Sequence, residues 1–216
     1  MGVPASQIKI AIDLPVLQMS SSFLSVSEKK NDGVLKIIFL SRLSPMKNLD
    51  FALQVLIHLN CNIQFDIYGP VEDPRYWEKC KLLIEALPDN INCTYFGSAA
   101  PENVRNIFSS YDLFFFPTRG ENYGHVVAES ISVGTPVLLS DQTPWRNLEA
   151  DGLGWDIPLD NIHKFADKIN IVAQLSPLDR EQQRIIVKQR AQERLLDPAA
   201  TEANRELFYS LVRDSD

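Results

Sequence analysis

The sequence has few cysteines, no long apolar run and no excess of positive charge, and each of these absences excludes a class of protein. Its three cysteines are spread along the chain without a C-x-x-C pair, which argues against a disulfide framework and a zinc site. No apolar run reaches the length of a membrane span, and the N-terminus lacks the cationic and apolar stretches of a signal peptide. We therefore expect a cytoplasmic protein with reduced thiols.

Negative charge predominates in the chain, with 28 acidic side chains against 21 basic ones and a net charge of -7. Such a chain has no general electrostatic attraction for a polyphosphate backbone, so we expect no nucleic-acid partner. A site for a smaller phosphorylated ligand would need a local cluster of cations. Loops that bring basic residues together are therefore the places where such a site is expected.

Short apolar runs alternate with helical patterns over most of the 216 residues, of which 45% are apolar. The apolar runs lie at 35–40, 63–68, 91–96, 112–116, 137–140 and 154–157, and the helical patterns between them at 49–59, 75–87, 101–110 and 124–133. This alternation, with short Gly/Pro turns, is typical of a parallel sheet covered on both faces. We predict an α/β fold with a Rossmann-like, doubly wound parallel sheet of about six strands.

The two ends of the chain differ from this pattern. Residues 1–33 form a lead-in with one extended patch at 8–12, and they end in the turn signal Asn31-Asp32-Gly33. From residue 161 onward the pattern is helical, with segments at 162–175, 178–195 and 198–212. We therefore predict extra C-terminal helices after the sheet.

Ligands of doubly wound sheets bind at the carboxyl ends of the strands, so the loops at 41–47, 69–74, 97–100, 117–124 and 140–145 are expected to carry function. In the first of them, Arg42 offers a planar fork for phosphate oxygens and Lys47 a point charge. The free N–H groups of the helix that follows would add to such an anion site. Two ordinary surface cations would give the same pattern. We expect the side chain of Asn48 to cap that helix.

Two glutamates flank Gly124 in the fourth strand-end loop, with Glu121 in the loop and Glu129 inside the predicted helix. At a rise of about 1.5 Å per residue, Glu129 lies roughly 7 to 8 Å along the helix from Gly124. That separation suits a ligand with an anionic middle, which the helix N-terminus would face, and a vicinal diol, which a carboxylate can bind. Alternatively, Glu121 only complements the helix dipole and Glu129 is solvated.

The ordered set of motifs resembles a known family. It comprises Ser41-Arg42-Leu43 with Lys47, Gly69, Gly97, the Phe-Phe-Pro-Thr run at 115–118, Glu121-x7-Glu129, Gly134-Thr135-Pro136-Val137 and the run at 149–154. Together, over about residues 34–208, these motifs resemble the C-terminal domain of group 1 retaining glycosyltransferases of the GT-B fold. Two residues depart from the family pattern: Asn48 stands where the family usually has glycine, and His125 where an apolar residue is common.

The resemblance implies a role for each matching residue. The residues that it places around the donor are Arg42, Lys47, Gly97, Ser98, Glu121, Asn122, Tyr123, Gly124, His125 and Glu129. Arg42 and Lys47 would hold a diphosphate, and Glu129 the ribose hydroxyls. Glu121 would lie beside the donor sugar and the reacting centre, so that Arg42, Lys47 and Glu121 are the implied catalytic residues. The backbone of residues 122–125 would meet the sugar and phosphate, and the loop at Gly97 and Ser98 the base.

The implied activity is transfer of a sugar from a nucleotide-diphospho-sugar to an acceptor, with retention of configuration and without a metal or other cofactor. Family members are usually about twice this length and begin with an acceptor-binding domain. On that basis we expect residues 1–33 to be a linker or remnant of a missing N-terminal domain and residues 34–216 to be the nucleotide-sugar-binding domain. This fragment alone would transfer little or no sugar. Because many family members act on lipid-linked acceptors, the full-length protein could also associate peripherally with the inner membrane.

Two other readings keep the same fold. A sugar-nucleotide epimerase of related architecture would bind the same donor but catalyse another reaction, whereas a phosphorylase would need a lysine for pyridoxal phosphate in a matching context, which we do not find. A catalytically silent nucleotide-binding or interaction domain is the alternative from a different class. Substitution of Glu129 and Lys47 tests this alternative, because unchanged nucleotide binding would show that the glutamate and the cations do not form the site.

Overall fold

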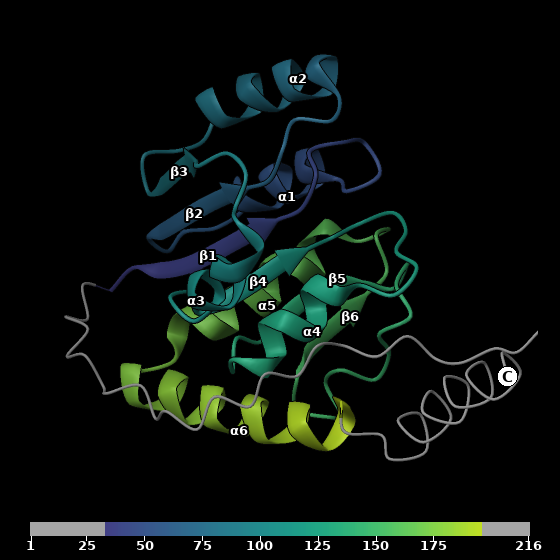
Figure 1. Cartoon of the computed structure of the whole chain (residues 1–216). Coiled ribbons are helices and arrows are strands. Elements are labelled where there is room, and N and C mark those ends of the chain that lie inside the picture. Colours follow the sequence, from purple (N-terminus) through teal and green to yellow (C-terminus); the bar gives the residue numbers. More distant parts are fainter. Residues whose placement is uncertain (1–32, 196–216) are drawn as a thin grey trace, which may run out of the picture.

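The computed structural model describes residues 33–195, which form a six-stranded parallel sheet in the order β3-β2-β1-β4-β5-β6 (Figure 1). The strands are β1 (Leu35–Leu40), β2 (Ile63–Tyr68), β3 (Ile91–Tyr95), β4 (Leu113–Phe116), β5 (Val137–Ser140) and β6 (Gly154–Ile157). This confirms the predicted doubly wound sheet, with strand limits within a residue of those expected. The predicted extended patch at 8–12 and the predicted helix at 198–212 lie outside the described residues.

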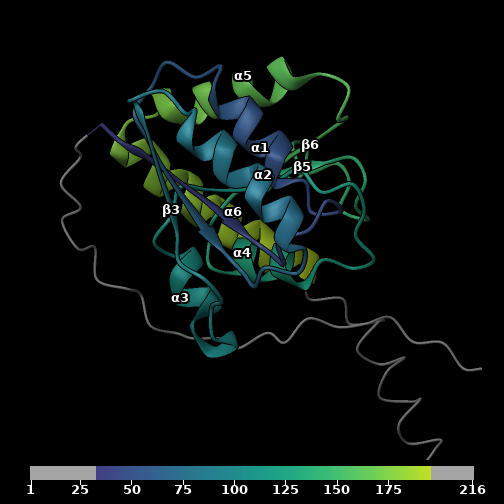
Figure 2. The same cartoon turned by 90° about the horizontal axis from the view of Figure 1, so that it is seen from above.

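Helices cover both faces of the sheet (Figure 2). On one face α1 (Leu49–Leu56) packs against α2 (Pro74–Glu85) and α5 (Ile162–Gln174), and on the other α4 (His125–Ser132) packs against α3 (Val104–Phe108) and α6 (Pro177–Leu195). The helix predicted at 101–110 is divided: a 3-10 turn, η2 (Pro101–Asn103), precedes α3, which ends at Phe108. The predicted C-terminal helices α5 and α6 are both present.

The core lies on both faces of the central strands. Every residue of β4 and β5 is buried, and three consecutive phenylalanines, at 114–116, fill the space between sheet and helices. Phe114 stacks on Phe116 with ring centroids 5.4 Å apart, and Phe115 contacts Phe165 of α5 on the opposite face. The apolar runs are continuous in the sequence because a parallel strand covered on both faces has no polar side.

The order of the strands fixes where loops from distant parts of the chain meet. From β1 the chain winds outward through β2 to β3, and then returns to β4 beside β1 and winds outward the other way. The carboxyl ends of β1 and β4 therefore flank the point at which the winding reverses, where open α/β sheets bind ligands. The loops at 41–48 and 117–124 both begin at this point.

Helix α6 is attached to the sheet by a partly buried arginine, Arg184. The two terminal nitrogens of Arg184 donate hydrogen bonds to the carbonyl oxygens of Ser109, Tyr111 and Val133 and to the hydroxyl of Thr135. These acceptors lie at the end of α3, before β4 and after α4, so one side chain connects three segments. Burial lowers the pKa of Arg184, and the charges of Glu181 and Asp112 oppose this effect.

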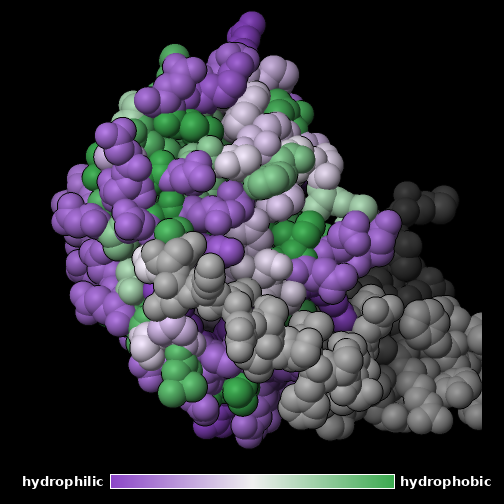
Figure 3. All heavy atoms as spheres, turned by 90° about the vertical axis from the view of Figure 1, so that its left-hand side faces the viewer, coloured by the Kyte–Doolittle hydropathy of each residue, from purple (hydrophilic) through white to green (hydrophobic). Residues whose placement is uncertain are grey.

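Polar and apolar side chains are mixed over the side of the molecule shown in Figure 3, with hydrophilic residues predominating. The large apolar side chains that reach solvent in the described residues, including Leu82 and Leu178, are distributed over several elements. No helix in the described part of the chain combines the length and the apolar character that crossing a membrane requires.

Candidate functional site

The loop after β1 brings Lys47 and Asn48 into the protein interior. Asn48 is 1% exposed and adopts a left-handed backbone, with φ 62° and ψ 38°. Its amide Nδ2 donates to the carbonyl of Pro117 at 2.9 Å, and its side chain makes no capping bond to α1, so the predicted side-chain cap is wrong. A capping side chain needs an extended backbone at this position. The left-handed backbone, which asparagine and glycine adopt most readily, directs the amide to the neighbouring loop instead.

Three strand-end loops are joined by hydrogen bonds at this edge of the sheet. The carbonyl of Met46, in the loop after β1, accepts from the Arg119 N–H at 2.8 Å and from the Thr118 hydroxyl at 3.0 Å. The loop after β5 joins them, because the Ser140 hydroxyl donates to the carbonyl of Thr118 and the Glu121 N–H donates to that of Gln142. The loops after β1, β4 and β5 therefore form one connected surface (Figure 1).

Lys47 and Glu121 form an ion pair on this surface. The Nζ of Lys47 lies 2.9 Å from Oε2 of Glu121, and the two side chains are only 11% and 20% exposed. Burial acts to raise the pKa of Glu121, but the hydrogen bond and charge of Lys47, the N–H of Asn122 and the charge of Arg42 outweigh it, so the pKa lies below its usual value. Glu121 is therefore an ionised carboxylate next to a shielded cation.

Gly124 begins α4 directly beside this ion pair. It adopts φ 81°, and a Cβ there would lie 3.0 Å from Nε1 of Trp145 and 3.3 Å from Cγ of Glu121, so only glycine fits without displacing a neighbour. The Trp145 indole donates to the carbonyl of Tyr123 at 2.6 Å and so fixes the backbone that leads into α4. A helix leaves its first N–H groups without intrahelical partners. The structure thus brings Lys47, Glu121 and the start of α4 together.

Arg42 lies at the rim of the same surface but has a partner that the sequence did not indicate. Its guanidinium is paired with Glu72, from the loop after β2, and the two side chains are 61% and 41% exposed. The charge of Arg42 also acts to lower the pKa of Glu121. An anion that bound Arg42 would compete with Glu72.

Glu129 lies on α4, one turn after His125, and is partly buried. Burial raises the pKa of its carboxyl, while the charges of Arg105 on α3 and of His125 act in the opposite direction. Its carboxylate is thus partly desolvated and flanked by two side chains that can carry positive charge. The sequence predicted Glu129 as a site residue but did not indicate Arg105.

The predicted base loop and the remaining site residues lie at the same edge of the sheet. Gly97 accepts a hydrogen bond at its carbonyl from the Gly69 N–H, at 2.8 Å, which fastens the loop after β3 to the end of β2. Ser98 and Asn122 are exposed, and the Asn122 N–H donates to Glu121 Oε1 at 2.9 Å. The structure therefore brings Lys47, Glu121 and Gly124 into contact, and Arg42 lies in the same loop as Lys47. Gly97 and Ser98 follow β3, the outermost strand, and lie farther along the row of strand ends.

The sequence predicted functional loops at 69–74 and 140–145, which carry Glu72 and Trp145, but it did not predict a role for these two residues. Their position in loops that follow strands was the only feature of the sequence that indicated them. For Thr118, whose hydroxyl bridges Met46 and Gly120, the Phe-Phe-Pro-Thr motif was the signal. Arg105 is the second residue of α3, and no motif in the sequence indicated it.

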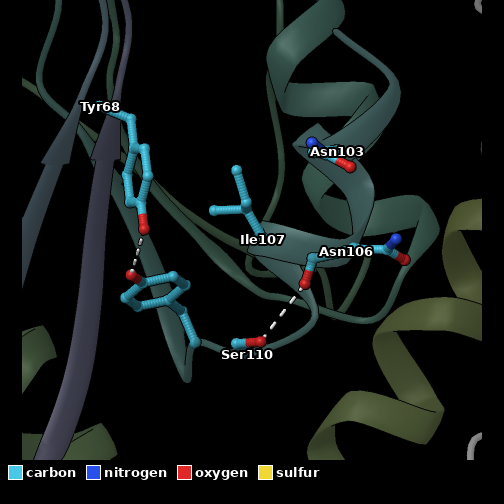
Figure 4. A pocket seen from close by; sticks show the side chains of 6 residues that line it. Tyr68, Asn103, Asn106, Ile107 and Ser110 are labelled. Atoms are coloured by element: carbon cyan, nitrogen blue, oxygen red, sulfur yellow. Dashed lines mark hydrogen bonds between the residues drawn. The ribbon is translucent and has the colours of Figure 1, made fainter. Parts of the chain in front are cut away.

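A separate hollow of about 350 Å³ lies between the end of β2 and α3 (Figure 4). In this view Ile107 points toward Tyr68, whereas the side chain of Asn106 points away. The Tyr111 hydroxyl donates to the buried carboxylate of Asp66 at 2.7 Å and lies 3.3 Å from the Tyr68 hydroxyl. The six residues that line the hollow include none of the predicted donor residues.

The cysteines and acidic residues of the described chain do not form a metal centre. No group of three or more His, Cys, Asp or Glu side chains within residues 33–195 is placed to hold a metal ion. The three cysteines are free, as expected, and burial raises the pKa of Cys80 to about 11 and that of Cys93 to about 12. The expectation that the activity requires no metal stays a prediction.

Comparison with known proteins identifies the family. Residues 21–192 match the family model described as "Glycosyl transferases group 1", and the chain therefore belongs to this family. No curated protein sequence matches the chain. The family assignment agrees with the motifs at the carboxyl ends of β1 and β4.

Several solved structures share the fold at low sequence identity. S. aureus TarM, as a mutant in complex with UDP, fondaparinux and α-GlcNAc-glycerol, matches with a TM-score of 0.66 and 20% identity, over 80% of this chain and 35% of its own. Anabaena HepE in complex with UDP and glucose matches with a TM-score of 0.66 and 17% identity, over 84% of this chain and 49% of its own. The catalytic domain of the Helicobacter pylori cholesterol-α-glucosyltransferase matches with a TM-score of 0.62 and 20% identity, over 74% of this chain and 98% of its own. The chain thus spans about a third to a half of the first two proteins.

Proposed function

We propose that this chain is the donor-binding domain of a retaining glycosyltransferase and that it holds a nucleotide-diphospho-sugar at the carboxyl ends of β1 and β4. The observation that carries the proposal is the convergence of a shielded cation, Lys47, an ionised carboxylate, Glu121, and the N-terminus of α4 at Gly124. A cation and a helix N-terminus together form a site for a diphosphate. The UDP in the TarM and HepE complexes supports a nucleotide ligand in proteins of this fold.

In this proposal the donor lies across the start of α4. Lys47, the first amides of the helix and Arg42, once released from Glu72, neutralise the diphosphate, and Glu129 accepts hydrogen bonds from the ribose hydroxyls. In the transfer step the bond from the anomeric carbon to the diphosphate oxygen breaks, an acceptor hydroxyl oxygen bonds to the same face of that carbon, and the hydroxyl proton passes to the leaving diphosphate. Negative charge grows on the leaving diphosphate, where the preorganised cations and helix amides stabilise it. Glu121 lies where it can orient the sugar and stabilise positive charge on the ring.

We propose that acceptor binding depends on residues other than those described, because the chain spans 35% and 49% of TarM and HepE. The described residues form one sheet with its helices, and every site residue named above lies at a single edge of it. On this proposal the chain binds donor and, by itself, transfers little or no sugar. A second domain that faces this edge would provide the acceptor.

Calorimetric titration with uridine, guanosine and adenosine diphosphate sugars tests the proposal. We expect one of them to bind the full chain, and we expect E129Q to weaken its binding about tenfold, because a charged acceptor for the ribose diol becomes a neutral amide. E78Q is the matched control, since Glu78 is an exposed side chain paired with Lys81 on α2. If none of the donors binds, or if E129Q binds as tightly as E78Q, the proposed donor site is contradicted. The result would then favour an interaction domain without a donor site.

A further inference from the structure

Trp145, whose indole N–H bonds the carbonyl of Tyr123, is itself held from another side by the end of α6. The guanidinium of Arg194, in the last turn of α6, lies over the Trp145 ring at 5.3 Å from its centre. Both terminal nitrogens of Arg194 donate to the carbonyl of Arg146, each at 3.0 Å, and one of them also pairs with Asp151. One side chain of α6 therefore holds the face of the indole and the backbone next to it.

Trp145 in turn lies against the residue that begins α4. Its side chain is buried, and its one donor is used on the carbonyl of Tyr123, directly before Gly124. Its Nε1 lies 3.0 Å from the place that a Cβ would take on Gly124, so the indole fills the space beside this glycine. The carbonyl of Gly124 accepts from the N–H groups of Val127, at 2.8 Å, and Ala128, at 3.4 Å. A displaced indole would therefore shift the residue on which the first turn of α4 is built.

The loop that carries Trp145, residues 141–153 between β5 and β6, contains neither helix nor strand. We propose that Arg194 is a positioning residue, which holds Trp145 and, through it, the start of α4 at the donor site. The effect on donor binding rests on the proposed function. Without the guanidinium the indole loses the partner on its face, and its N–H leaves the Tyr123 carbonyl more often. The helix amides are then less well preorganised for the diphosphate, and preorganisation is a source of affinity.

Trp155 on β6 provides a matched control within the same chain. It is 9% exposed, its indole N–H donates to Glu149 at 3.0 Å, and the ammonium of Lys168 lies 5.4 Å from the centre of its ring. This is the same combination of an indole hydrogen bond and an overlying cation. Lys168 belongs to α5, however, which covers the opposite face of the sheet from α4. W155F and K168M therefore remove matching contacts without touching the start of α4.

Hydrogen exchange of the free protein tests the positioning without any donor. The reporters are the amides of Val127 and Ala128, which donate to Gly124, and the amides of β4 are the internal reference for overall unfolding. Relative to that reference, we expect W145F and R194M each to speed exchange about fivefold, the effect of one neutral hydrogen bond. The double variant W145F/R194M should exchange no faster than W145F, because Arg194 acts through the indole N–H. W155F and K168M should leave the reporters unchanged.

Calorimetric titration of the same variants with the nucleotide-sugar that the chain binds measures the consequence for the proposed site. W145F and R194M should bind it about fivefold more weakly than K168M, and R194K, which keeps a cation for the ring face, should recover part of the loss. If R194M matches K168M in exchange and in affinity, the inference is wrong while the donor site stands. Additive effects in W145F/R194M would contradict it as well, because Arg194 would then act independently of Trp145. If exchange responds as expected but the unaltered chain binds no nucleotide-sugar, the proposed function fails and the positioning of α4 stands.

Discussion

Lys47 is held in conditions that an ordinary surface lysine does not meet. Its side chain is 11% exposed, its ammonium lies 5.5 Å from the centre of the Phe116 ring, and Glu121 is its ion-pair partner. A buried cation with only one carboxylate has donors left for a further anion. In the proposed donor site the residue would therefore act as a fixed positive charge that is shielded from water.

We therefore expect K47M to weaken binding of the nucleotide-sugar about 30-fold, or about 2 kcal/mol, in calorimetry. Hydrogen bonds to charged groups are worth this much when they are shielded from water. K81M is the control, since Lys81 is an exposed residue of α2 that pairs with Glu78, and it should bind donor like the unaltered chain. Comparison of the unfolding midpoints separates loss of the contact from loss of the fold. Equal affinity of K47M and K81M would contradict the assigned role.

The left-handed backbone of Asn48 makes a separate prediction about stability. N48A must keep φ near 62° with a Cβ and loses the bond to Pro117, whereas N48G loses the bond but has no Cβ. We expect N48A to be less stable than N48G by about 1 kcal/mol, because glycine adopts the left-handed region without steric cost. Urea unfolding of both variants measures the difference. An N48A variant at least as stable as N48G would show that the loop does not depend on this backbone.

At the scale of single residues, the sequence indicated which residue types gather at the site, but not how they pair. Arg42 and Lys47 were both predicted as phosphate ligands, yet one is an exposed residue paired with Glu72 and the other a shielded residue paired with Glu121. Asn48 was expected to cap α1 and instead bonds Pro117. These outcomes depend on contacts between loops that lie 30 to 74 residues apart in the chain, which no local pattern records.

At the scale of elements, the strands were predictable because each is buried on both faces and so reads as an uninterrupted apolar run. The helix expected at 101–110 was less regular, because Pro101 opens a 3-10 turn and α3 ends at Phe108, before the turn that leads to β4. Helix α6 was expected from its pattern, but its attachment to the sheet through Arg184 was not. Long-range hydrogen bonds from an arginine produce no periodic pattern in the sequence, so this attachment could not be predicted from it.

The attachment of α6 can be tested by removing that side chain. R184M removes the donors that Arg184 provides to the partly buried carbonyls of Ser109 and Tyr111, and we expect it to lower the free energy of unfolding by about 3 kcal/mol. R190M is the control on the same helix: Arg190 is exposed and pairs only with Glu193 there, and its loss should cost less than about 0.5 kcal/mol. Urea unfolding followed by circular dichroism provides both values. A cost for R184M no larger than that for R190M would mean that α6 is held by apolar packing alone.

At the scale of the whole molecule, the strand order explains why residues far apart in sequence form one site. Placing β1 next to β4 brings the loops at 41–48 and 117–124 together, and β5 adds the loop at 140–145. The sequence allowed this arrangement to be predicted because the motifs follow one another in the order of a doubly wound sheet. Their close contact could not be predicted, since it depends on backbone bonds such as that from the Arg119 N–H to the Met46 carbonyl.

The most direct test of the donor site is a crystal structure of this chain with the nucleotide-sugar that it binds. The account predicts that the diphosphate lies within hydrogen-bonding distance of Lys47 Nζ and of the first amides of α4, with the ribose hydroxyls on Glu129. A nucleotide bound elsewhere, for example in the hollow beside Tyr68, or a diphosphate that Lys47 does not reach, would contradict it.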